Sequence, residues 1–250
     1  MASLQAVFWD VDGTLADTEM DGHRPAFNAA FRELDLPFVW NEALYAQLLA
    51  IPGGLRRVQH YADEQGIRLS TDDLAQIRDR KRVHYRQRAL DGAIRTRPGV
   101  QRLLLDLHAQ EIQQWIVTSS GRASVEALFG GQPALRELFH GVVTADDVSQ
   151  VKPAPDGYRE AHRRCGFPLG SVLAIEDSEA GLHAAKAAGL ACLLTPSPWD
   201  TGLTALFDQA AAVFDHLGET GQPMRQWAGP PCTGPQVTVE YMGSLLERRG

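Results

Sequence analysis

The chain has 250 residues, of which 44% are hydrophobic and 22% charged, so it can bury a large core in one domain or two smaller ones. A net charge of −7 argues against binding to nucleic acid or to an anionic membrane surface, so an anionic substrate would need a local site. Three widely spaced cysteines, Cys165, Cys192 and Cys232, argue against a disulfide framework or a structural zinc site.

The sequence contains no apolar run long enough to span a membrane, and its first apolar segment starts too close to Met1 for a signal peptide. We therefore expect a soluble, cytoplasmic protein. It is expected to act as a monomer on a small molecule, with neither nucleic acid nor a membrane as a partner.

The first predicted element is a buried strand that ends in a polar loop. Residues 4–9 form an apolar run, which stops at Asp10-Val11-Asp12-Gly13-Thr14. Asp10 and Asp12 share one face of an extended backbone, where two carboxylates repel each other unless a divalent cation or a proton relieves the repulsion. Taken alone, this stretch is as typical of a polar turn with Gly13 at a positive φ as of a catalytic strand end.

Helical periodicity fills most of the segment from residue 17 to residue 95, where hardly any strand signal occurs. The predicted helices cover residues 24–34, 41–49, 55–65 and 71–90. Two acidic residues follow Thr71 in the first turn of the last helix, and Gly92 lies where a C-terminal cap is expected. This block predicts a small helical domain inserted after the first strand.

From Pro98 onward, helices alternate with short apolar strands. The predicted helices cover residues 99–109, 122–129, 156–165 and 179–188, and the predicted strands cover residues 114–118, 142–144, 172–175, 191–194 and 211–214. Such alternation is typical of βα units, so it predicts an α/β fold with a parallel sheet. We expect a core domain of residues 1–16 and 95–250, a cap domain of residues 17–94, and a Pro/Gly-rich loop at residues 217–235.

Polar side chains follow the strands that converge at one edge of this sheet. In an open parallel sheet, ligands bind beyond the carboxyl ends of the strands. The residues placed there are Asp10 and Asp12, Thr118 to Ser120, Lys152, and Glu176 with Asp177. Each alone has an ordinary structural explanation, such as a surface lysine or a helix cap, but their joint placement favours chemistry at this edge.

The chemistry that these groups suit is phosphoryl transfer, with Asp10 as the nucleophile. A carboxylate that attacks a phosphate meets repulsion of roughly 4 kcal/mol per charge pair at about 4 Å and an effective dielectric near 20. Mg²⁺ offsets this repulsion and prefers carboxylate and carbonyl oxygens. Its predicted ligands are Asp10, Asp177 and the Asp12 carbonyl, with Glu176 orienting a bound water.

The remaining groups complete this hypothesis. Lys152 supplies a positive charge to the phosphoryl oxygens and Asp10. Thr118 and the backbone N–H groups of Ser119 and Ser120 bind the phosphate at the start of a helix. Asp12 acts as the general acid that protonates the leaving oxygen, and then as the base that activates water.

Four ordered motifs resemble the signature motifs of the haloacid dehalogenase superfamily: Asp10-Val-Asp12-Gly13-Thr14, Thr118, Lys152-Pro-x-Pro-Asp156 and Glu176-Asp177-Ser178. The resemblance covers nearly the whole chain. It implies a Rossmann-like core with an inserted helical cap of the C1 type. Residues 17–28, 51–54 and 242–246 are similar to the CbbY branch, which also implies that residues 237–248 pack back on the core.

What the CbbY branch implies is a Mg²⁺-dependent sugar-phosphate phosphatase. Its characteristic substrate is xylulose-1,5-bisphosphate, an inhibitor of the Calvin-cycle enzyme Rubisco, from which removal of the 1-phosphate gives xylulose 5-phosphate. The resemblance places Glu19 and His23 toward the sugar hydroxyls. Gly53 and Gly54 would let the backbone approach the distal phosphate, with Arg56 or Arg57 neutralising its charge.

One position departs from the branch pattern, because Leu55 stands where the family has a lysine. We expect Arg56, one residue further along, to take the place of that lysine. The departure bears on the identity of the sugar and leaves the predicted chemistry unchanged.

Two other classes of function share parts of this pattern. A phosphomutase of the β-phosphoglucomutase kind has the same core but returns the phosphate to the sugar. A non-catalytic phospho-acceptor, as in receiver domains, also places aspartate and lysine around Mg²⁺. The helical insertion argues against a receiver, whose acceptor must face partner proteins, and Asp12 as an acid and base argues for turnover. Phosphate release against sugar-phosphate isomerisation distinguishes the first two.

Overall fold

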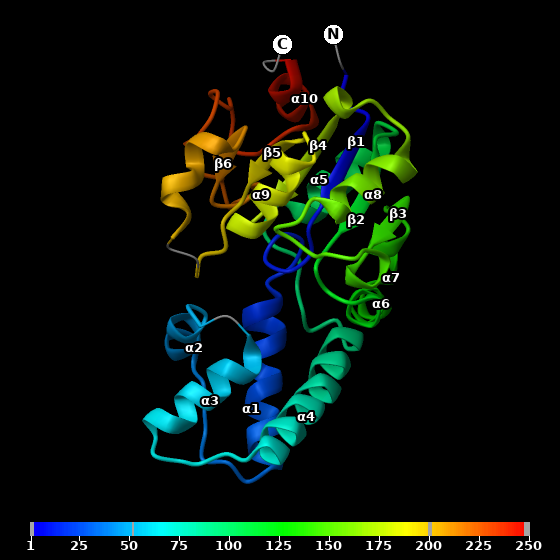
Figure 1. The fold of residues 1–250 in the computed structure, drawn as a ribbon. Helices are drawn as coiled ribbons and strands as arrows, with labels where there is room; N and C mark the ends of the chain where they lie inside the picture. The colour runs from blue at the N-terminus through cyan, green and yellow to red at the C-terminus, as the bar shows by residue number, and fades with distance from the viewer. Residues whose placement is uncertain (1–2, 52, 200–201, 248–250) are drawn as a thin grey trace.

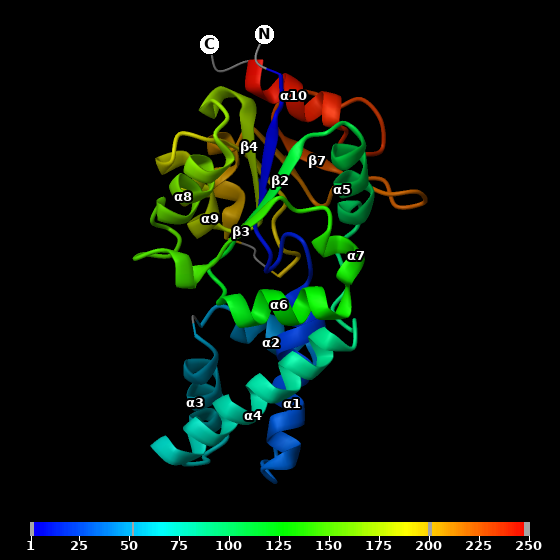
Figure 2. The ribbon, with the colours of Figure 1, turned by 90° about the vertical axis from the view of Figure 1, so that its right-hand side faces the viewer.

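The structure is a computed structural model that describes residues 3–51, 53–199 and 202–247. The chain forms two lobes, one built on a β-sheet and one made of helices (Figure 1). A view turned by 90° shows the same division, with α4 and α1 leading away from the sheet lobe (Figure 2). α10, the last helix, lies at the end of the sheet lobe that is far from the helical lobe.

The sheet has seven strands in the order β3-β2-β1-β4-β5-β6-β7. Their bounds are β1 Ala6–Trp9, β2 Gln113–Val117, β3 Gly141–Val143, β4 Val172–Glu176, β5 Ala191–Leu194, β6 Ala212–Phe214 and β7 Gln226–Ala228. The first six strands are parallel, which confirms the predicted α/β class. Each predicted strand agrees within one residue, except that β1 begins two residues later than predicted. Only β7 was not predicted; it pairs antiparallel with β6 inside the stretch expected to be a loop.

Helices cover both faces of the sheet. Val7 and Trp9 point to one face, against α5 (Val100–Ala109), α6 (Arg122–Gly131) and α10 (Val239–Glu247). Ala6 and Phe8 point to the other face, against α8 (Asp156–Cys165) and α9 (Glu179–Ala187). All four side chains of β1 are fully buried, as alternation on a central strand requires. The predicted packing of the tail is met by α10, while Arg248 lies outside the described residues.

Short helical segments complete the sheet lobe. They are α7 (Pro133–Arg136) and the 3₁₀ turns η2 (Ala145–Asp147), η3 (Leu169–Ser171) and η4 (Leu203–Gln209). Among the described residues, no helix combines the length and the apolar character needed to cross a membrane.

The helical lobe consists of η1 (Thr18–His23), α1 (Arg24–Glu33), α2 (Glu42–Leu48), α3 (Gly54–Glu64) and α4 (Thr71–Leu90). The prediction for α4 is confirmed at both ends. Ser70 and Asp73 form a reciprocal capping box at its start, and Gly92, with φ 67°, follows its end. The sequence did not predict η1, which is a π-helical turn that leads directly into α1.

An aromatic cluster forms the core of the helical lobe. Trp40 is fully buried at its centre, with ring centroids 5.0 Å from Phe27, 4.9 Å from Phe31 and 5.5 Å from Tyr45. The Asn28 side chain bonds both the N–H and the carbonyl of Trp40 at 2.8 Å. Because this cluster is separate from the two clusters that cover the sheet, the lobe has an apolar core of its own.

The two segments that join the lobes run side by side. Ala16 and Thr96 form an antiparallel bridge, and the Arg97 N–H donates to the Leu15 carbonyl at 2.9 Å. The first of these segments begins directly after the loop that follows β1. The helical lobe is therefore attached at the carboxyl ends of the parallel strands.

Candidate active site

The register of the sheet brings three strand ends together. Trp9 on β1 pairs with Ile116 on β2 and with Ile175 on β4. The next residue of each strand therefore lies beside the others, and the Asp10 N–H donates to the Ile175 carbonyl at 3.1 Å. Residues far apart in sequence meet here because the strands are parallel and end at the same level.

Lys152 lies between two carboxylates at this edge. Its Nζ is 2.5 Å from Asp10 Oδ1 and 2.6 Å from Glu176 Oε1, and it donates to the Val117 carbonyl at 2.7 Å. The side chains of Lys152, Asp10 and Glu176 are 8%, 9% and 0% exposed. Burial alone would lower the pKa of Lys152, but the two carboxylates raise it above its ordinary value. The lysine therefore keeps its charge at neutral pH.

Three buried acids surround this lysine. Asp10, Glu176 and Asp177 each offer an oxygen, and these oxygens lie within 4.8 Å of one another. Burial raises the pKa of Asp10 to about 7, with Glu176 and Asp12 adding to the effect and Lys152 opposing it. Burial likewise raises the pKa of Asp177 well above its usual range, helped by its two acidic neighbours. Without a cation, ionisation of Asp10 and Asp177 costs free energy, so both carboxyl groups bind a proton more readily than ordinary ones.

The donor set fits a divalent cation of the hard type. Three carboxylates are ligands that Mg²⁺ prefers, and two positive charges would offset their repulsion. Glu176 Oε2 is buried and has no hydrogen-bond partner among the described residues. The backbone of Gly13, at φ 88°, lies so close to the cluster that a Cβ there would be 2.0 Å from Asp177 Oδ2. The residues present therefore fit the predicted magnesium site.

Asp12, the predicted general acid and base, lies just outside the cluster of Asp10, Glu176 and Asp177. The Ser120 hydroxyl donates to Asp12 Oδ2 at 2.5 Å, and the Ser120 N–H donates to Thr118 Oγ1 at 3.0 Å. Thr118 is buried, and Ser119 is exposed. The end of β2 and the loop after β1 thus face each other as predicted. The Asp12 carboxylate is not part of the acidic cluster, and the metal contact predicted for this residue is through its carbonyl.

Tyr158 is a site residue that sequence reasoning missed. Its hydroxyl donates to Glu176 Oε1 at 2.5 Å, and its ring centroid is 5.3 Å from Lys152 Nζ. The residue is fully buried on α8, where only Tyr158 and Ala161 are buried. A single aromatic residue on the buried face of a short polar helix was the available signal. Tyr158 holds the oxygen that Lys152 also holds, so it fixes the Glu176 side chain.

In the helical lobe, the predicted residue Glu19 belongs to a polar network. The Tyr45 hydroxyl donates to Glu19 Oε2 at 2.6 Å. Arg57 Nη1 donates to the Tyr45 hydroxyl at 3.1 Å and lies 3.6 Å from Glu19 Oε2. Arg57 Nε also donates to the Ile51 carbonyl at 2.9 Å. Arg57 is therefore held in place, with its charge directed toward Glu19.

His23 is held by stacking and by burial. Its ring centroid lies 4.4 Å from that of Tyr85, with the two planes 30° apart. Burial lowers the pKa of His23 to about 3, and the positive charges of Lys81 and Arg57 contribute to the lowering, while Asp12 opposes it. The imidazole is therefore neutral at physiological pH and can donate from one nitrogen and accept at the other.

Lys81 on α4 is a second residue that sequence reasoning missed. Its Nζ lies 5.3 Å from the Phe27 ring centroid and 5.2 Å from that of Tyr85. Burial lowers the pKa of Lys81 to about 8, against the pull of Glu19 and Asp12. Ile77, Tyr85 and Ala89 lie four residues before, four after and eight after it, and all are buried. A lysine on the buried stripe of a helix was the signal in the sequence.

Gly53 and Gly54, which were predicted to let the backbone approach the distal phosphate, also have an explanation in packing. Gly53 adopts φ 94°, and a Cβ at Gly54 would lie 2.9 Å from the Phe27 ring. Arg56 is exposed and, among the described residues, makes no hydrogen bond or ion pair. Arg57 instead turns inward to Glu19. The part predicted for Arg56 stays a prediction, and Arg57 is the arginine that the structure brings to the other predicted residues.

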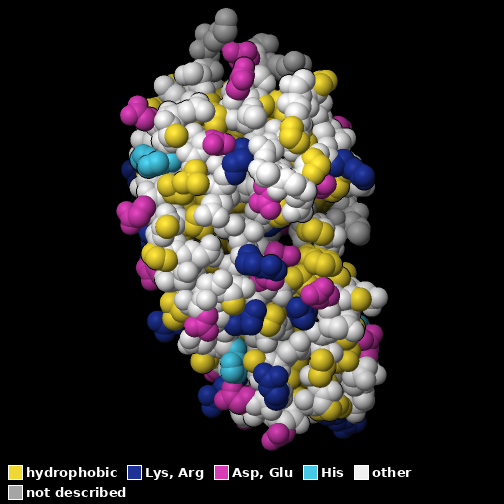
Figure 3. Space-filling view, turned by 180° about the vertical axis from the view of Figure 1, so that it is seen from behind, with side chains coloured by type: hydrophobic (Ala, Val, Ile, Leu, Met, Phe, Trp, Pro, Cys, Tyr) yellow, Lys and Arg dark blue, Asp and Glu magenta, His cyan; other side chains and the backbone are white. Residues whose placement is uncertain are grey.

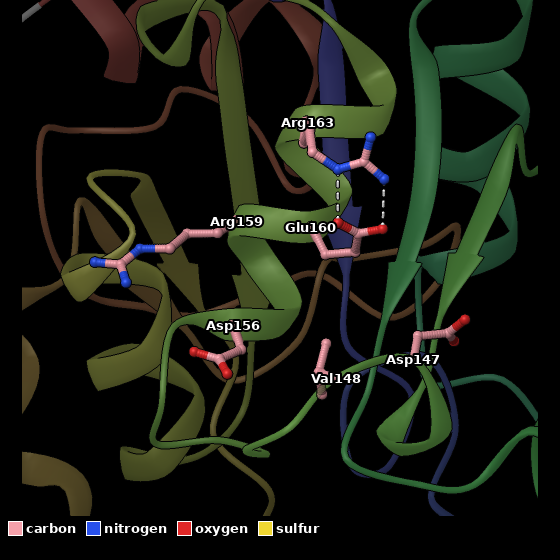
Figure 4. A pocket seen from close by; sticks show the side chains of 6 residues that line it. All are labelled: Asp147, Val148, Asp156, Arg159, Glu160 and Arg163. Carbon is pink, nitrogen blue, oxygen red and sulfur yellow. Dashed lines mark hydrogen bonds and ion pairs between the residues drawn. The ribbon is translucent and has the colours of Figure 1, made fainter.

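A separate surface hollow lies beside α8 (Figure 4). It is lined by Asp147, Val148, Asp156, Arg159, Glu160 and Arg163. Arg163 donates two hydrogen bonds of 2.8 Å to Glu160, and Arg122 pairs with Asp147 at 2.7 Å. Most of its charges are thus satisfied at the surface, and its lining contains none of the predicted site residues. We assign it no ligand.

A parallel α/β sheet with buried acids and a lysine at its carboxyl edge, beneath a helical lobe, is the architecture of a hydrolase class. The chain belongs to the haloacid dehalogenase-like hydrolase family, whose profile matches residues 4–189. This membership confirms the predicted family and makes the chain an enzyme, so the receiver-like alternative is set aside.

Similar proteins place the chain within this family. It is 36% identical over 231 residues to Protein CbbY, plasmid, of Cupriavidus necator, covering 89% of each chain. It is 38% identical over 202 residues to Protein CbbY of Rhodobacter capsulatus, covering 80% of this chain and 88% of the relative. These relatives confirm the predicted resemblance to the CbbY branch.

Solved structures give the same result. CbbY from Rhodobacter sphaeroides in complex with phosphate superposes with a TM-score of 0.70 at 33% identity, covering 85% of this chain and 94% of that one. An aspartate-to-asparagine mutant of that protein in complex with xylulose-(1,5)bisphosphate matches with a TM-score of 0.69 at 32% identity over the same shares.

Proposed function

We propose that this hydrolase is a Mg²⁺-dependent phosphatase that converts xylulose-1,5-bisphosphate to xylulose 5-phosphate and phosphate. The buried pair of Asp10 and Lys152, 2.5 Å apart among further acids, carries the proposal. A carboxylate in this setting has a positive group beside it and little water around it, as a nucleophile toward phosphorus requires. The complex of the similar CbbY protein with xylulose-(1,5)bisphosphate supports the choice of sugar.

The metal would be held by Asp10, Asp177 and the Asp12 carbonyl, with Glu176 orienting a bound water. Once bound, Mg²⁺ would neutralise the phosphoryl oxygens and so reduce their repulsion of the attacking carboxylate. Lys152 would add a positive charge to the same oxygens while it holds Asp10 Oδ1. Thr118 and the N–H groups that follow it would bind the phosphoryl group from the other side.

The first chemical step joins a carboxylate oxygen of Asp10 to phosphorus. The bond between phosphorus and the sugar oxygen breaks, and Asp12 gives that oxygen a proton. Asp12, now ionised, then takes a proton from a water that attacks phosphorus. The bond to Asp10 breaks, phosphate leaves, and both carboxyl groups return to their starting states.

The helical lobe would recognise the rest of the substrate. We propose residues 17–94 as a cap domain and residues 1–16 and 95–250 as the core domain. Arg57 and Lys81 would neutralise the second phosphate, with Arg56 adding charge at the rim. Glu19 and neutral His23 would bond the sugar hydroxyls. In Figure 3, Lys and Arg side chains lie over the helical lobe among Asp and Glu side chains, so this lobe offers cations to an anionic substrate although the net charge of the chain is −7.

The test is phosphate release from xylulose-1,5-bisphosphate by the purified chain, with and without Mg²⁺. We expect release that requires Mg²⁺ and is absent in Asp10→Asn. Glucose 1-phosphate, assayed for both isomerisation and phosphate release, separates the phosphomutase alternative. No phosphate from any sugar phosphate tried would refute the proposal, and full activity in Asp10→Asn would refute its mechanism.

A further inference from the structure

Arg97 is a buried arginine at the point where the chain returns from the helical lobe to the sheet. It is 7% exposed, and its backbone N–H donates to Leu15 beside the bridge between Ala16 and Thr96. A buried guanidinium is costly unless its N–H groups find acceptors, because it has lost its water. The positions of its hydrogen-bond acceptors therefore identify the backbone segments that Arg97 holds together.

Those acceptors come from three separate loops. Nη1 donates to the carbonyl oxygens of Gly13 and Thr195, and Nη2 donates to those of Pro196 at 3.0 Å and Asp215 at 2.8 Å. The loops follow β1, β5 and β6, so all three lie at the carboxyl edge of the parallel sheet. Within the described part of the chain, no carboxylate lies at hydrogen-bond distance from the Arg97 guanidinium. Arg97 thus joins backbone segments, and its charge reaches the Asp177 carboxyl only through space, where it opposes the rise in the pKa of that group.

Gly13 connects Arg97 to the acidic cluster. The Gly13 carbonyl accepts from Arg97, and the Gly13 N–H donates to the Ala16 carbonyl at 2.9 Å. On its other side, the Gly13 backbone lies against the Asp177 carboxylate, since a Cβ there would be 2.0 Å from Oδ2. Any shift of this turn would displace the Asp12 carbonyl and one wall of the cluster.

We propose that Arg97 is a positioning residue that sets the affinity of the acidic cluster for its divalent cation. It clamps the Gly13 carbonyl and so fixes the turn after Asp12 against Asp177, without touching the substrate. The proposed contribution is the position of the turn. The charge of Arg97 acts in two opposite ways, since it repels a cation but favours the ionised form of Asp177, and a lysine at this position keeps that charge. The inference rests on the magnesium site of the proposed function.

The test compares two conservative variants. Arg97→Lys keeps the charge but cannot hold three loops at once. Arg102→Lys is the matched control, because Arg102 donates to three carbonyl oxygens, those of Leu217, Gly218 and Val237, and does not contact Gly13. We expect both variants to lower Tm, whereas only Arg97→Lys weakens Mg²⁺ binding, by about tenfold in calorimetry without substrate. At saturating Mg²⁺, the kcat of Arg97→Lys should recover.

Equal Mg²⁺ affinity in the two variants would overturn the assignment of Arg97 and leave the proposed function standing. If the unsubstituted chain bound no Mg²⁺, both the proposed magnesium site and the role of Arg97 would be refuted. Should Arg97→Lys fail to fold, the unsubstituted chain labelled with ¹⁵N-arginine gives the answer. Added Mg²⁺ should shift the guanidinium resonances of Arg97 more than those of Arg102, and equal shifts would contradict the proposal.

Discussion

The sheet lobe and the helical lobe hold their polar groups in different ways. At the sheet edge, Lys152 bridges Asp10 and Glu176, whose side chains are at most 9% exposed. In the helical lobe, Arg57 and Glu19 lie 3.6 Å apart with side chains 12% and 30% exposed. The two acids of the first set are placed by strand register, while the second set depends on where helices place long side chains.

From this contrast we expect the sheet edge to carry out the chemistry and the helical lobe to recognise the substrate. Charges that are buried together interact strongly, and losing one leaves the others uncompensated. Charges near solvent interact more weakly and adapt to a ligand. Substitutions at the sheet edge should therefore abolish turnover, and substitutions in the helical lobe should change substrate affinity.

The largest effect is expected from Lys152→Met. Removal of the amine leaves Asp10 and Glu176 facing each other in a buried site, so the free energy of unfolding should fall by about 3 kcal/mol. The kcat should fall roughly a thousandfold, because the attacking carboxylate loses its positive neighbour. Lys186→Met is the control, since Lys186 is exposed and, among the residues that the structure describes, bonds only Gln209, at 2.7 Å. Stopped assays and chemical denaturation measure both quantities; comparable kcat values in the two variants would remove Lys152 from the mechanism.

The second prediction concerns pH and metal together. The pKa of Asp10 is raised to about 7 in the fold, so without metal its contribution to stability is full below about pH 4 and is lost as pH rises through 7. Mg²⁺ must displace that proton to bind. The Mg²⁺ dissociation constant should therefore be about tenfold lower at pH 8 than at pH 6. Calorimetry in two buffers of different ionisation enthalpy checks the proton release, and an affinity independent of pH would contradict it.

Much of the sheet-edge site could be predicted because it follows from local rules. Asp10, Lys152 and Glu176 are far apart in sequence, but Asp10 follows β1, Glu176 ends β4, and Lys152 lies in the loop after β3. Parallel strands bring these ends together. The same reasoning located the six parallel strands. It missed β7, which has three residues in a Pro/Gly-rich stretch and no alternation to detect.

The helical lobe was harder to predict for a geometric reason. One residue along a helix turns a side chain by about 100°, so whether Arg56 or Arg57 faces inward depends on packing that the sequence does not state. The π-helical turn at Thr18–His23, which carries Glu19 and His23, has no periodic signature of its own. Lys81 stood on a detectable buried stripe, but nothing in the sequence says what that stripe faces.

Arg57 and Arg56 offer a direct way to sharpen this comparison. Arg57→Ala should raise the KM for xylulose-1,5-bisphosphate about fivefold with little change in kcat, because it removes binding that substrate and transition state share. Arg56→Ala should also raise KM more than it lowers kcat, but by less, since its side chain is exposed. Steady-state kinetics on the pair decides which arginine serves the second phosphate. A larger KM effect in Arg56→Ala would restore the order expected from the sequence.

The last prediction concerns His23 and affects stability alone; it tests whether this histidine is as well shielded from solvent as the charged groups at the sheet edge. The pKa of His23 is lowered to about 3, so its contribution to stability is full above about pH 6.5 and is lost as pH falls below that value. The parent should lose unfolding free energy between pH 6.5 and 4.5, and His23→Gln should reduce that slope by at most about 1 kcal/mol per pH unit. His84→Gln is the control, because His84 on the same lobe bonds Glu33 at 2.8 Å near the surface. Equal slopes in the parent and His23→Gln would mean that His23 is readily protonated in the folded state. Its place against Tyr85 would then be a solvent-accessible contact, and the recognition site would be more open than the chemistry site throughout.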